Sequence, residues 1–255
     1  MIRPLIAGNW KMNLDHVEAI HLVQQIGVLL RAHAHDHVDV MVIPPAIDLR
    51  SVTSVVDADR LPLQVGAQHV HPVERGAYTG EISTGMLRRL GVRAVLVGHS
   101  ERREMFHMDD AVVAATFSAV QRAELFPILC VGESAERRDD GDADDFVTRQ
   151  LASALADASD APFAVAYEPI WAIGTGAVAS TEQIAAMAAT IRAALPAHHR
   201  ASTPVLYGGS VKADAAADLA RHGDVNGFLV GGASLNAEEF VGIVTHANDC
   251  YGRSR

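Results

Sequence analysis

Eight short apolar runs, each followed by a stretch with helical periodicity, constrain the fold of this chain more than any other feature. Most of the runs are continuous, which is the pattern of parallel strands buried on both faces. We expect strands at Leu5–Asn9, Val38–Ile43, Leu63–Gln68, Ala94–Gly98, Pro127–Val131, Phe163–Tyr167, Val205–Gly208 and Gly227–Val230. Eight strand–helix units in 255 residues predict an α/β chain folded as a single closed (β/α)8 barrel domain over residues 1–255.

The segments between the runs have the features of amphipathic helices. Apolar residues recur at spacings of three and four at Leu22, Ile26, Leu29 and Leu30, and again at Val113, Phe117 and Val120. Capping residues precede three of these segments, at Asp15, Asp109 and Ser180. An open doubly wound sheet is the alternative, and it usually has a Gly-x-Gly-x-x-Gly turn after its first strand. Here that strand is followed by Trp10-Lys11-Met12-Asn13, which favours the barrel.

The composition excludes several classes of protein. Lys and Arg number 21 against 31 Asp and Glu, so the net charge of −10 argues against nucleic-acid and anionic-membrane partners. A small anionic substrate stays possible, because a few backbone amides and one lysine suffice to bind it. No apolar stretch reaches 18 residues, so we expect no transmembrane helix. Two cysteines do not make a disulfide framework, and a cytoplasmic location is expected.

Polar side chains at the predicted strand ends are the candidates for catalysis, because the active sites of barrels lie at the carboxyl ends of the strands. Asn9 and Lys11 end the first strand, His99 and Glu101 follow the fourth, and Glu168 follows the sixth. On one barrel mouth, Glu168, His99 and Lys11 would supply a base, an electrophile and a cation.

Two glycine turns follow the last two strands, at Gly208-Gly209-Ser210 and Gly231-Gly232-Ala233-Ser234. Barrels often bind phosphate at these loops through backbone N–H groups, so a phosphate ester is the expected ligand and no metal is required. The tract His33-Ala34-His35-Asp36-His37 and the acidic run Asp139–Asp145 are expected to be solvated segments.

Several blocks of the chain resemble the signature blocks of the triosephosphate isomerase family, in the order of that family, from Pro4 to about Val244. They are Ala7-Gly8-Asn9-Trp10-Lys11-Met12-Asn13, Gly66-Ala67-Gln68, Gly76-Ala77-Tyr78-Thr79-Gly80-Glu81, Gly98-His99-Ser100-Glu101-Arg102-Arg103, Cys130-Val131-Gly132-Glu133, Ala166-Tyr167-Glu168-Pro169 with its continuation to Gly176, Tyr207-Gly208-Gly209-Ser210 and Leu229-Val230-Gly231-Gly232-Ala233-Ser234. The resemblance implies an aldose–ketose isomerase that interconverts dihydroxyacetone phosphate and glyceraldehyde 3-phosphate through an enediolate, with no cofactor.

The same resemblance implies a role for each candidate residue. Glu168 acts as the base, and a closed site that holds little water is expected to make its carboxylate more basic. His99 polarises the carbonyl oxygen as a neutral imidazole, as is known for this family. Lys11 stabilises negative charge, Asn9 orients Lys11 and binds substrate, and Glu101 is a partner of Lys11. The phosphate is implied to bind the amides of Gly174, Ser210, Gly231 and Gly232.

Two further segments are assigned by the resemblance. A lid over the site is implied at Pro169, Ile170, Trp171, Ala172, Ile173, Gly174, Thr175 and Gly176. The segment His69–Gly80 is implied to insert into a second copy in a homodimer, with Tyr78 and Thr79 at its tip and Thr79 directed toward Asn9 and Lys11 of that copy.

Two alternatives stay open at this point. A related isomerase acting on a four-carbon ketose phosphate would use the same chemistry with more room at the end away from the phosphate. A barrel that binds phosphate without catalysis would not need Lys11, His99 and Glu168 together.

Overall fold

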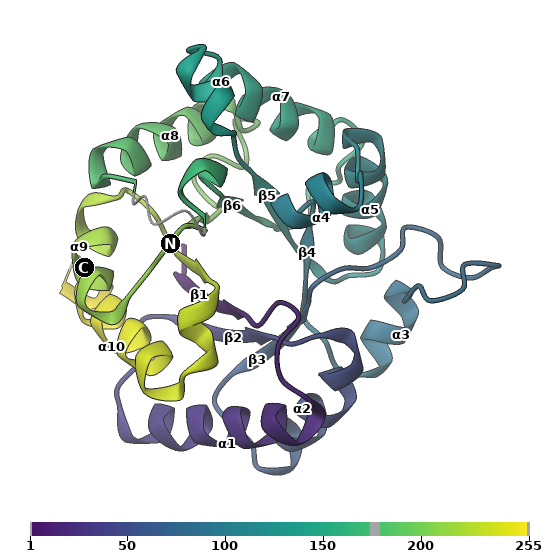
Figure 1. Cartoon of the computed structure of the whole chain (residues 1–255), viewed down its shortest axis with the longest axis vertical. Helices are drawn as coiled ribbons and strands as arrows, with labels where there is room; N and C mark the ends of the chain where they lie inside the picture. Colours follow the sequence, from purple (N-terminus) through teal and green to yellow (C-terminus); the bar gives the residue numbers. More distant parts are fainter. Residues whose placement is uncertain (1, 174–178, 254–255) are drawn as a thin grey trace.

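All eight apolar runs form parallel strands that pair in sequence order and close into a barrel (Figure 1). The structure is a computed structural model, and it describes residues 2–173 and 179–253. The strands are β1 (Leu5–Asn9), β2 (Asp39–Ile43), β3 (Gln64–Ala67), β4 (Ala94–Val97), β5 (Phe126–Val131), β6 (Ala164–Tyr167), β7 (Val205–Tyr207) and β8 (Gly227–Val230). Each end lies within one residue of the prediction, and the pairing of β1 with β8 excludes the open sheet.

Helices surround the barrel and connect successive strands, as the alternating pattern predicts (Figure 1). The α-helices in the described residues are α1 (His16–Ala32), α2 (Leu49–Ala58), α3 (Thr84–Arg89), α4 (Ser100–Met105), α5 (Asp110–Arg122), α6 (Ala135–Asp139), α7 (Ala143–Leu155), α8 (Thr181–Ala194), α9 (Ala213–His222) and α10 (Ala237–Arg253). Short 3-10 turns are η1 (Ala46–Asp48), η2 (Ile170–Ala172) and η3 (Gly232–Leu235).

The predicted caps and helix faces are confirmed. Asp15 and Ser180 both form capping boxes at the starts of α1 and α8. The side chain of Asp109 accepts a hydrogen bond from the N–H of Val112 at the start of α5. Leu22, Ile26 and Leu30 of α1 are buried and Leu29 is partly buried, and Val113, Phe117 and Val120 of α5 are also buried. These apolar faces pack on the outside of the barrel and hold the helices there.

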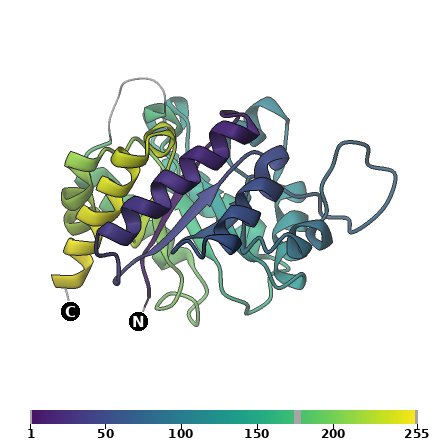
Figure 2. The ribbon, with the colours of Figure 1, turned by 90° about the horizontal axis from the view of Figure 1, so that it is seen from below.

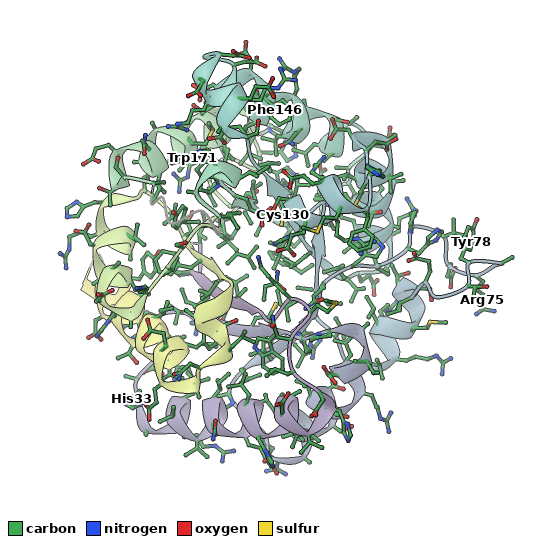
Figure 3. The ribbon with its side chains drawn as sticks, viewed as in Figure 1. His33, Arg75, Tyr78, Cys130, Phe146 and Trp171 are labelled. Carbon is green, nitrogen blue, oxygen red and sulfur yellow. The ribbon has the colours of Figure 1, made fainter. Side chains whose placement is uncertain are left out.

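The barrel interior has a separate apolar core, because alternate strand residues point inward. Its members are Leu5, Ala7, Met41, Ile43, Ala94, Leu96, Ile128, Cys130, Ala164, Ala166, Leu206 and Leu229. Figure 3 shows Cys130 in the central part of the barrel. Every second residue of β1 and of β6 points into the barrel, namely Leu5 and Ala7 in β1 and Ala164 and Ala166 in β6. Asn9 and Glu168 are the next residues in these two series. The period of two therefore directs Asn9 and Glu168 into the mouth of the barrel.

One long connection projects from the barrel body. The segment between β3 and α3 extends sideways in both ribbon views (Figures 1 and 2). Its residues 73–80 are exposed, and it contains Tyr78, which is labelled in Figure 3. No helix within the described parts of the chain is long and apolar enough to cross a lipid bilayer.

Candidate active site

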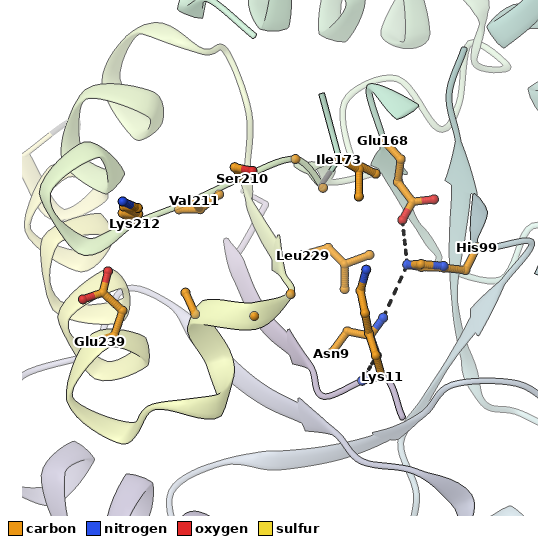
Figure 4. A pocket seen from close by; sticks show the side chains of 15 residues that line it. Asn9, Lys11, His99, Glu168, Ile173, Ser210, Val211, Lys212, Leu229 and Glu239 are labelled. Atoms are coloured by element: carbon orange, nitrogen blue, oxygen red, sulfur yellow. Dashed lines mark hydrogen bonds and ion pairs between the residues drawn. The ribbon is translucent and has the colours of Figure 1, made fainter. Parts of the chain in front are cut away.

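A cavity of about 590 Å³ lies at the carboxyl ends of the strands, and it contains most of the predicted site residues (Figure 4). Its lining includes Asn9, Lys11, His99, Glu168, Ile173, Gly208, Gly209, Ser210, Val211, Lys212, Leu229, Gly231, Gly232, Ala233 and Glu239. A second cavity of about 610 Å³ adjoins it and shares Asn9, Lys11 and His99. Glu101 lines this second cavity. Gly174, Thr175 and Gly176, which the sequence assigned to phosphate binding and to the lid, lie outside the described residues.

Lys11 is held in place through its backbone. It has a positive φ of 51°, a conformation that a residue with a side chain adopts only when its surroundings stabilise it. The side chain of Asn9 accepts a hydrogen bond from the N–H of Lys11 at 3.0 Å, and Gln68 Nε2 donates to the carbonyl of Lys11 at 2.7 Å. The Nζ atom donates to Glu101 Oε1 at 2.6 Å. Both ends of Lys11 are therefore fixed.

His99 is positioned by a turn at the end of β4. Gly98 has a φ of +72°, which favours glycine, and it allows His99 to cap the start of α4. His99 Nδ1 accepts from the N–H of Glu101 at 3.3 Å. This contact favours the tautomer with its proton on Nε2, and Nε2 lies 2.9 Å from Glu168 Oε1. The imidazole therefore presents an N–H group to the cavity.

Glu168 is buried at the end of β6, and two glycines make room for it. A Cβ atom at Gly132 would lie 1.8 Å from the carbonyl oxygen of Glu168. A Cβ at Gly208 would lie 3.0 Å from Glu168 Cγ. The carboxylate accepts from the N–H of Ser100 at 2.9 Å through Oε2 and contacts His99 through Oε1. The base expected from the sequence is thus held against the expected electrophile.

The pKa values of His99 and Glu168 shift in opposite directions. Burial opposes the charged form of His99, but the carboxylate of Glu168 outweighs burial and raises the pKa of His99. Burial favours the neutral form of Glu168, but His99, the N–H of Ser100 and Lys11 together lower the pKa of Glu168. The sequence led us to expect greater basicity for this carboxylate. In the conformation seen here its hydrogen bonds outweigh the burial.

The glycine turns after β7 and β8 also line the cavity. Gly208 lies next to Glu168, and Ser210 lies farther from it (Figure 4). Gly232 begins the turn η3, and nothing lies within 4 Å of the position that its Cβ would take. A Cβ at Gly231 would lie 3.5 Å from Lys11 Cε, so the turn and the lysine are neighbours. Ser234 Oγ donates to the carbonyl of Gly231 at 2.7 Å and fixes the turn. An anion bound at these backbones would lie beside the Lys11 side chain.

Glu133 lies in the block Cys130-Val131-Gly132-Glu133, and its residue type and spacing predicted no role for it. Its fully buried Oε1 accepts from Tyr167 Oη at 3.0 Å, Trp171 Nε1 at 2.8 Å and Arg138 at 2.8 Å. The guanidinium of Arg138 also lies 4.8 Å from the centre of the Trp171 ring. Glu133 therefore anchors the described part of the predicted lid, Pro169–Ile173. Other residues without a predicted role include Gln68, which holds the backbone of Lys11, and Ser100, which binds Glu168. Val211, Lys212, Leu229 and Glu239 line the cavity and also had no predicted role.

Tyr78 and Thr79 do not reach the cavity of their own chain. Both are exposed in the projecting segment, where the ring of Tyr78 packs 4.1 Å from the ring of His71. Gly80 and Glu81, which follow them, line the second cavity.

Comparisons with known proteins agree with the geometry. A family model described as triosephosphate isomerase matches residues 4–247. A protein named triosephosphate isomerase from Mycobacterium avium is 48% identical over 246 residues, which cover 94% of each chain. A protein of the same name from Leifsonia xyli is 47% identical over 250 residues, covering 95% of this chain and 96% of the relative.

Proposed function

The chain belongs to the triosephosphate isomerase family and is an isomerase of dihydroxyacetone phosphate and glyceraldehyde 3-phosphate; we propose that Glu168, His99 and Lys11 carry out its proton transfer. The 2.9 Å contact between Glu168 Oε1 and His99 Nε2 is the observation that carries this assignment. It means that one point in the cavity is within reach of both a carboxylate base and an N–H donor.

The proton moves between two carbons beside a carbonyl group. The carbonyl oxygen of the substrate takes the place of Glu168 as acceptor of the His99 Nε2–H group. Glu168, released from His99, loses the largest contribution that lowers its pKa while staying buried, so its basicity rises. It removes the proton from one carbon and returns it to the neighbouring carbon. Meanwhile His99 Nε2 gives its proton to the former carbonyl oxygen and takes up the proton of the former hydroxyl oxygen, so the imidazole ends as it began. His99 and Lys11 stabilise the enediolate oxygens between these steps.

We propose that the phosphate binds at the turns after β7 and β8. Ser210, Gly231 and Gly232 line the cavity there, and the Lys11 side chain adjoins Gly231. Asn9 orients Lys11 through the 3.0 Å hydrogen bond, and Glu101 Oε1 accepts a hydrogen bond from Lys11 Nζ at 2.6 Å. The amide of Gly174 stays a sequence-based part of this proposal.

The segment Pro169–Gly176 is proposed as a lid. An enediolate that carries a phosphate on the adjacent carbon loses phosphate readily in water, so the intermediate must be enclosed. The anchoring of Trp171 to Glu133 supports this role, because it fixes one end of the segment beside the base.

We also propose that the chain acts as a homodimer. Large apolar side chains are exposed next to the second cavity, among them Met12 at 95%, Met105 at 69% and Phe106 at 64%. Exposed apolar groups gathered around a cavity are typical of a protein interface. The projecting segment, whose residues 73–80 are exposed, would enter this cavity in the second copy with Tyr78 and Thr79 at its tip. The location proposed is the cytoplasm, and the domain proposed is the whole chain, residues 1–255.

The assignment of the base is tested by Glu168→Asp. The shorter side chain withdraws the carboxylate by about 1 Å, and a misplacement of that size costs about 100-fold in kcat. Binding of inorganic phosphate serves as the control and is expected to change little, because the backbone amides are untouched. A variant with wild-type kcat on dihydroxyacetone phosphate would exclude Glu168 as the base. Comparing turnover of triose and four-carbon ketose phosphates separates the main assignment from its alternative.

A further inference from the structure

A group of metal-ligating side chains lies at the opposite end of the barrel from the active site. Asp160 is in the connection from α7 to β6, and His198 and His199 are in the connection from α8 to β7. Both connections enter the amino ends of the strands, whereas the active site is at the carboxyl ends. Figure 2 shows loops of the corresponding colours at the end of the barrel where the chain termini also lie.

We propose that Asp160, His198 and His199 form a binding site for a divalent transition-metal ion such as Zn²⁺. Each residue offers one ligand atom, and these atoms all lie within 4.8 Å of one another. Two imidazole nitrogens and one carboxylate oxygen are donors that suit Zn²⁺, Ni²⁺ and Cu²⁺. Water would fill the remaining coordination positions on this solvated face.

The pair formed by His198 and Asp160 already has nearly the separation of two zinc ligands. His198 Nε2 lies 3.0 Å from Asp160 Oδ1. Two ligands about 2.0–2.1 Å from a tetrahedral ion are about 3.3 Å apart. The side chains of His198 and Asp160 are 58% and 90% exposed, so each can rotate by the small amount needed.

His199 supplies the fixed ligand. It is buried, with its ring edge-on to Phe163 at 4.9 Å and 4.2 Å from the ring of His198. The carbonyl of His199 accepts from the N–H of Thr203 at 2.9 Å, so its backbone is also fixed.

The loop that carries Asp160 is braced from α5. Gln121 Nε2 donates to the carbonyls of Ser159 and Ala161 at 3.2 and 3.0 Å, and its Oε1 accepts from the N–H of Ser159 at 2.8 Å. The residues on both sides of Asp160 are therefore held by one buried amide. With both backbones fixed, only two exposed side chains need to move to enclose an ion.

Metal binding requires one change of protonation. Nε2 of His198, the ring nitrogen that faces Asp160, must coordinate without its proton, which moves to Nδ1 of the same ring or to solvent. The ion then replaces the direct contact between His198 and Asp160 and joins the α7–β6 connection to the α8–β7 connection. Because the unfolded chain does not hold these three groups together, binding stabilises the folded protein.

The other histidine-rich segment lacks this arrangement. In the tract from His33 to His37, His33 Nδ1 contacts the carbonyl of Leu29 at 2.8 Å, and His35 Nδ1 contacts the carbonyl of His33 at 3.0 Å. Within residues 2–173 and 179–253, the cluster around His199 is the group of three that meets the geometric requirement.

The test is a calorimetric titration of the untagged full chain with Zn²⁺, on the wild type, His198→Ala and Asp160→Asn. His222→Ala is the matched control, because His222 is 56% exposed and also faces an aspartate, Asp218, at 3.8 Å. We expect the wild type and the control to bind one equivalent that the other two variants lose or bind about tenfold more weakly. We also expect a rise in Tm with Zn²⁺ in the wild type that His198→Ala lacks.

Three results would overturn the proposal: no uptake of Zn²⁺ by the wild type below about 1 mM, equal affinity in His198→Ala, or an equal loss in His222→Ala. The kcat of His198→Ala without added metal reports whether that variant is folded, since the site is remote from the catalytic cavity. If the variant is inactive, Asp160→Asn, which changes an exposed side chain, decides the question.

Discussion

Glu133 holds Trp171 of the proposed lid, and replacing Glu133 with glutamine measures how much that contact contributes to stability and to kcat. The carboxylate is fully buried, and its Oε1 accepts from Tyr167, Trp171 and Arg138. The glutamine keeps the shape and an oxygen acceptor but removes the charge. Hydrogen bonds to charged groups contribute about 1.5–3 kcal/mol and those between neutral groups about 0.5–1.5 kcal/mol, so each donor loses about 1 kcal/mol.

Three donors give a gross loss of about 3 kcal/mol in the free energy of unfolding. Removing the buried charge offsets part of this loss of stability, because the folded protein no longer has to desolvate a carboxylate. We therefore expect Glu133→Gln to lower the free energy of unfolding by about 2 kcal/mol. We expect kcat to fall as well, because Trp171 is held less firmly beside the base.

Urea denaturation at one fixed protein concentration measures the stability, and a coupled assay measures kcat. Glu136→Gln is the matched control, because Glu136 is an exposed carboxylate in α6, the helix that follows Glu133. The control is expected to stay within about 0.5 kcal/mol of the wild type. The reasoning is refuted if Glu133→Gln stays within the same range and keeps the wild-type kcat.

Four further outcomes are expected. Phe106→Asp places a charge on the exposed apolar surface, so the mass measured by light scattering should fall to that of a monomer. Val28→Asp is the control, because Val28 is 62% exposed on α1, and it should leave the mass unchanged. A monomeric wild type with full activity contradicts the dimer. Deleting Ile170–Ile173 should slow isomerisation steeply and raise the fraction of methylglyoxal and inorganic phosphate; an unchanged fraction contradicts the lid. Glu168→Gln should lower the pKa of His99, measured by NMR, because burial then dominates; an unchanged value contradicts the coupling. The raised pKa of His99 stabilises the folded protein below pH 6.5, and the lowered pKa of Glu168 stabilises it above pH 4.5. Glu168→Gln should therefore lose most stability relative to the wild type between pH 4.5 and pH 6.5.

The barrel could be predicted because its strands are buried on both faces. Continuous apolar runs mark such strands, and proline and glycine mark their ends, so the predicted limits differ from the structure by one residue at most. The inward direction of Asn9 and Glu168 follows from the same alternation. The direction of Lys11 could not be predicted from this alternation. It depends on a positive φ and on a hydrogen bond from Gln68, which is 57 residues away in the sequence.

The role of Glu133 and the proposed metal site could not be predicted either, because both depend on contacts between segments that are distant in the sequence. Glu133 becomes an anchor only because β5 and β6 are neighbours, which brings Tyr167 and Trp171 to its Oε1. His198 and Asp160 come together only because the connections preceding β6 and β7 meet at one end of the barrel. Neither pairing follows from residue spacing, since no short-range period joins their positions.

The basicity of Glu168 depends on whether its carboxylate is hydrogen-bonded to His99, and not on burial alone. Burial by itself would make the carboxylate a stronger base, which is what the sequence led us to expect. In the structure His99 and the N–H of Ser100 oppose burial and lower the pKa of Glu168. This arrangement keeps the carboxylate charged inside an apolar barrel, where an unpaired charge would be costly. In the mechanism that we propose, a substrate that offers its carbonyl oxygen to His99 removes this stabilisation from Glu168 at the position where the base is needed. Substrate binding itself then generates the basicity, and the same hydrogen-bond donor, His99 Nε2, holds the proposed base beforehand and polarises the carbonyl afterwards.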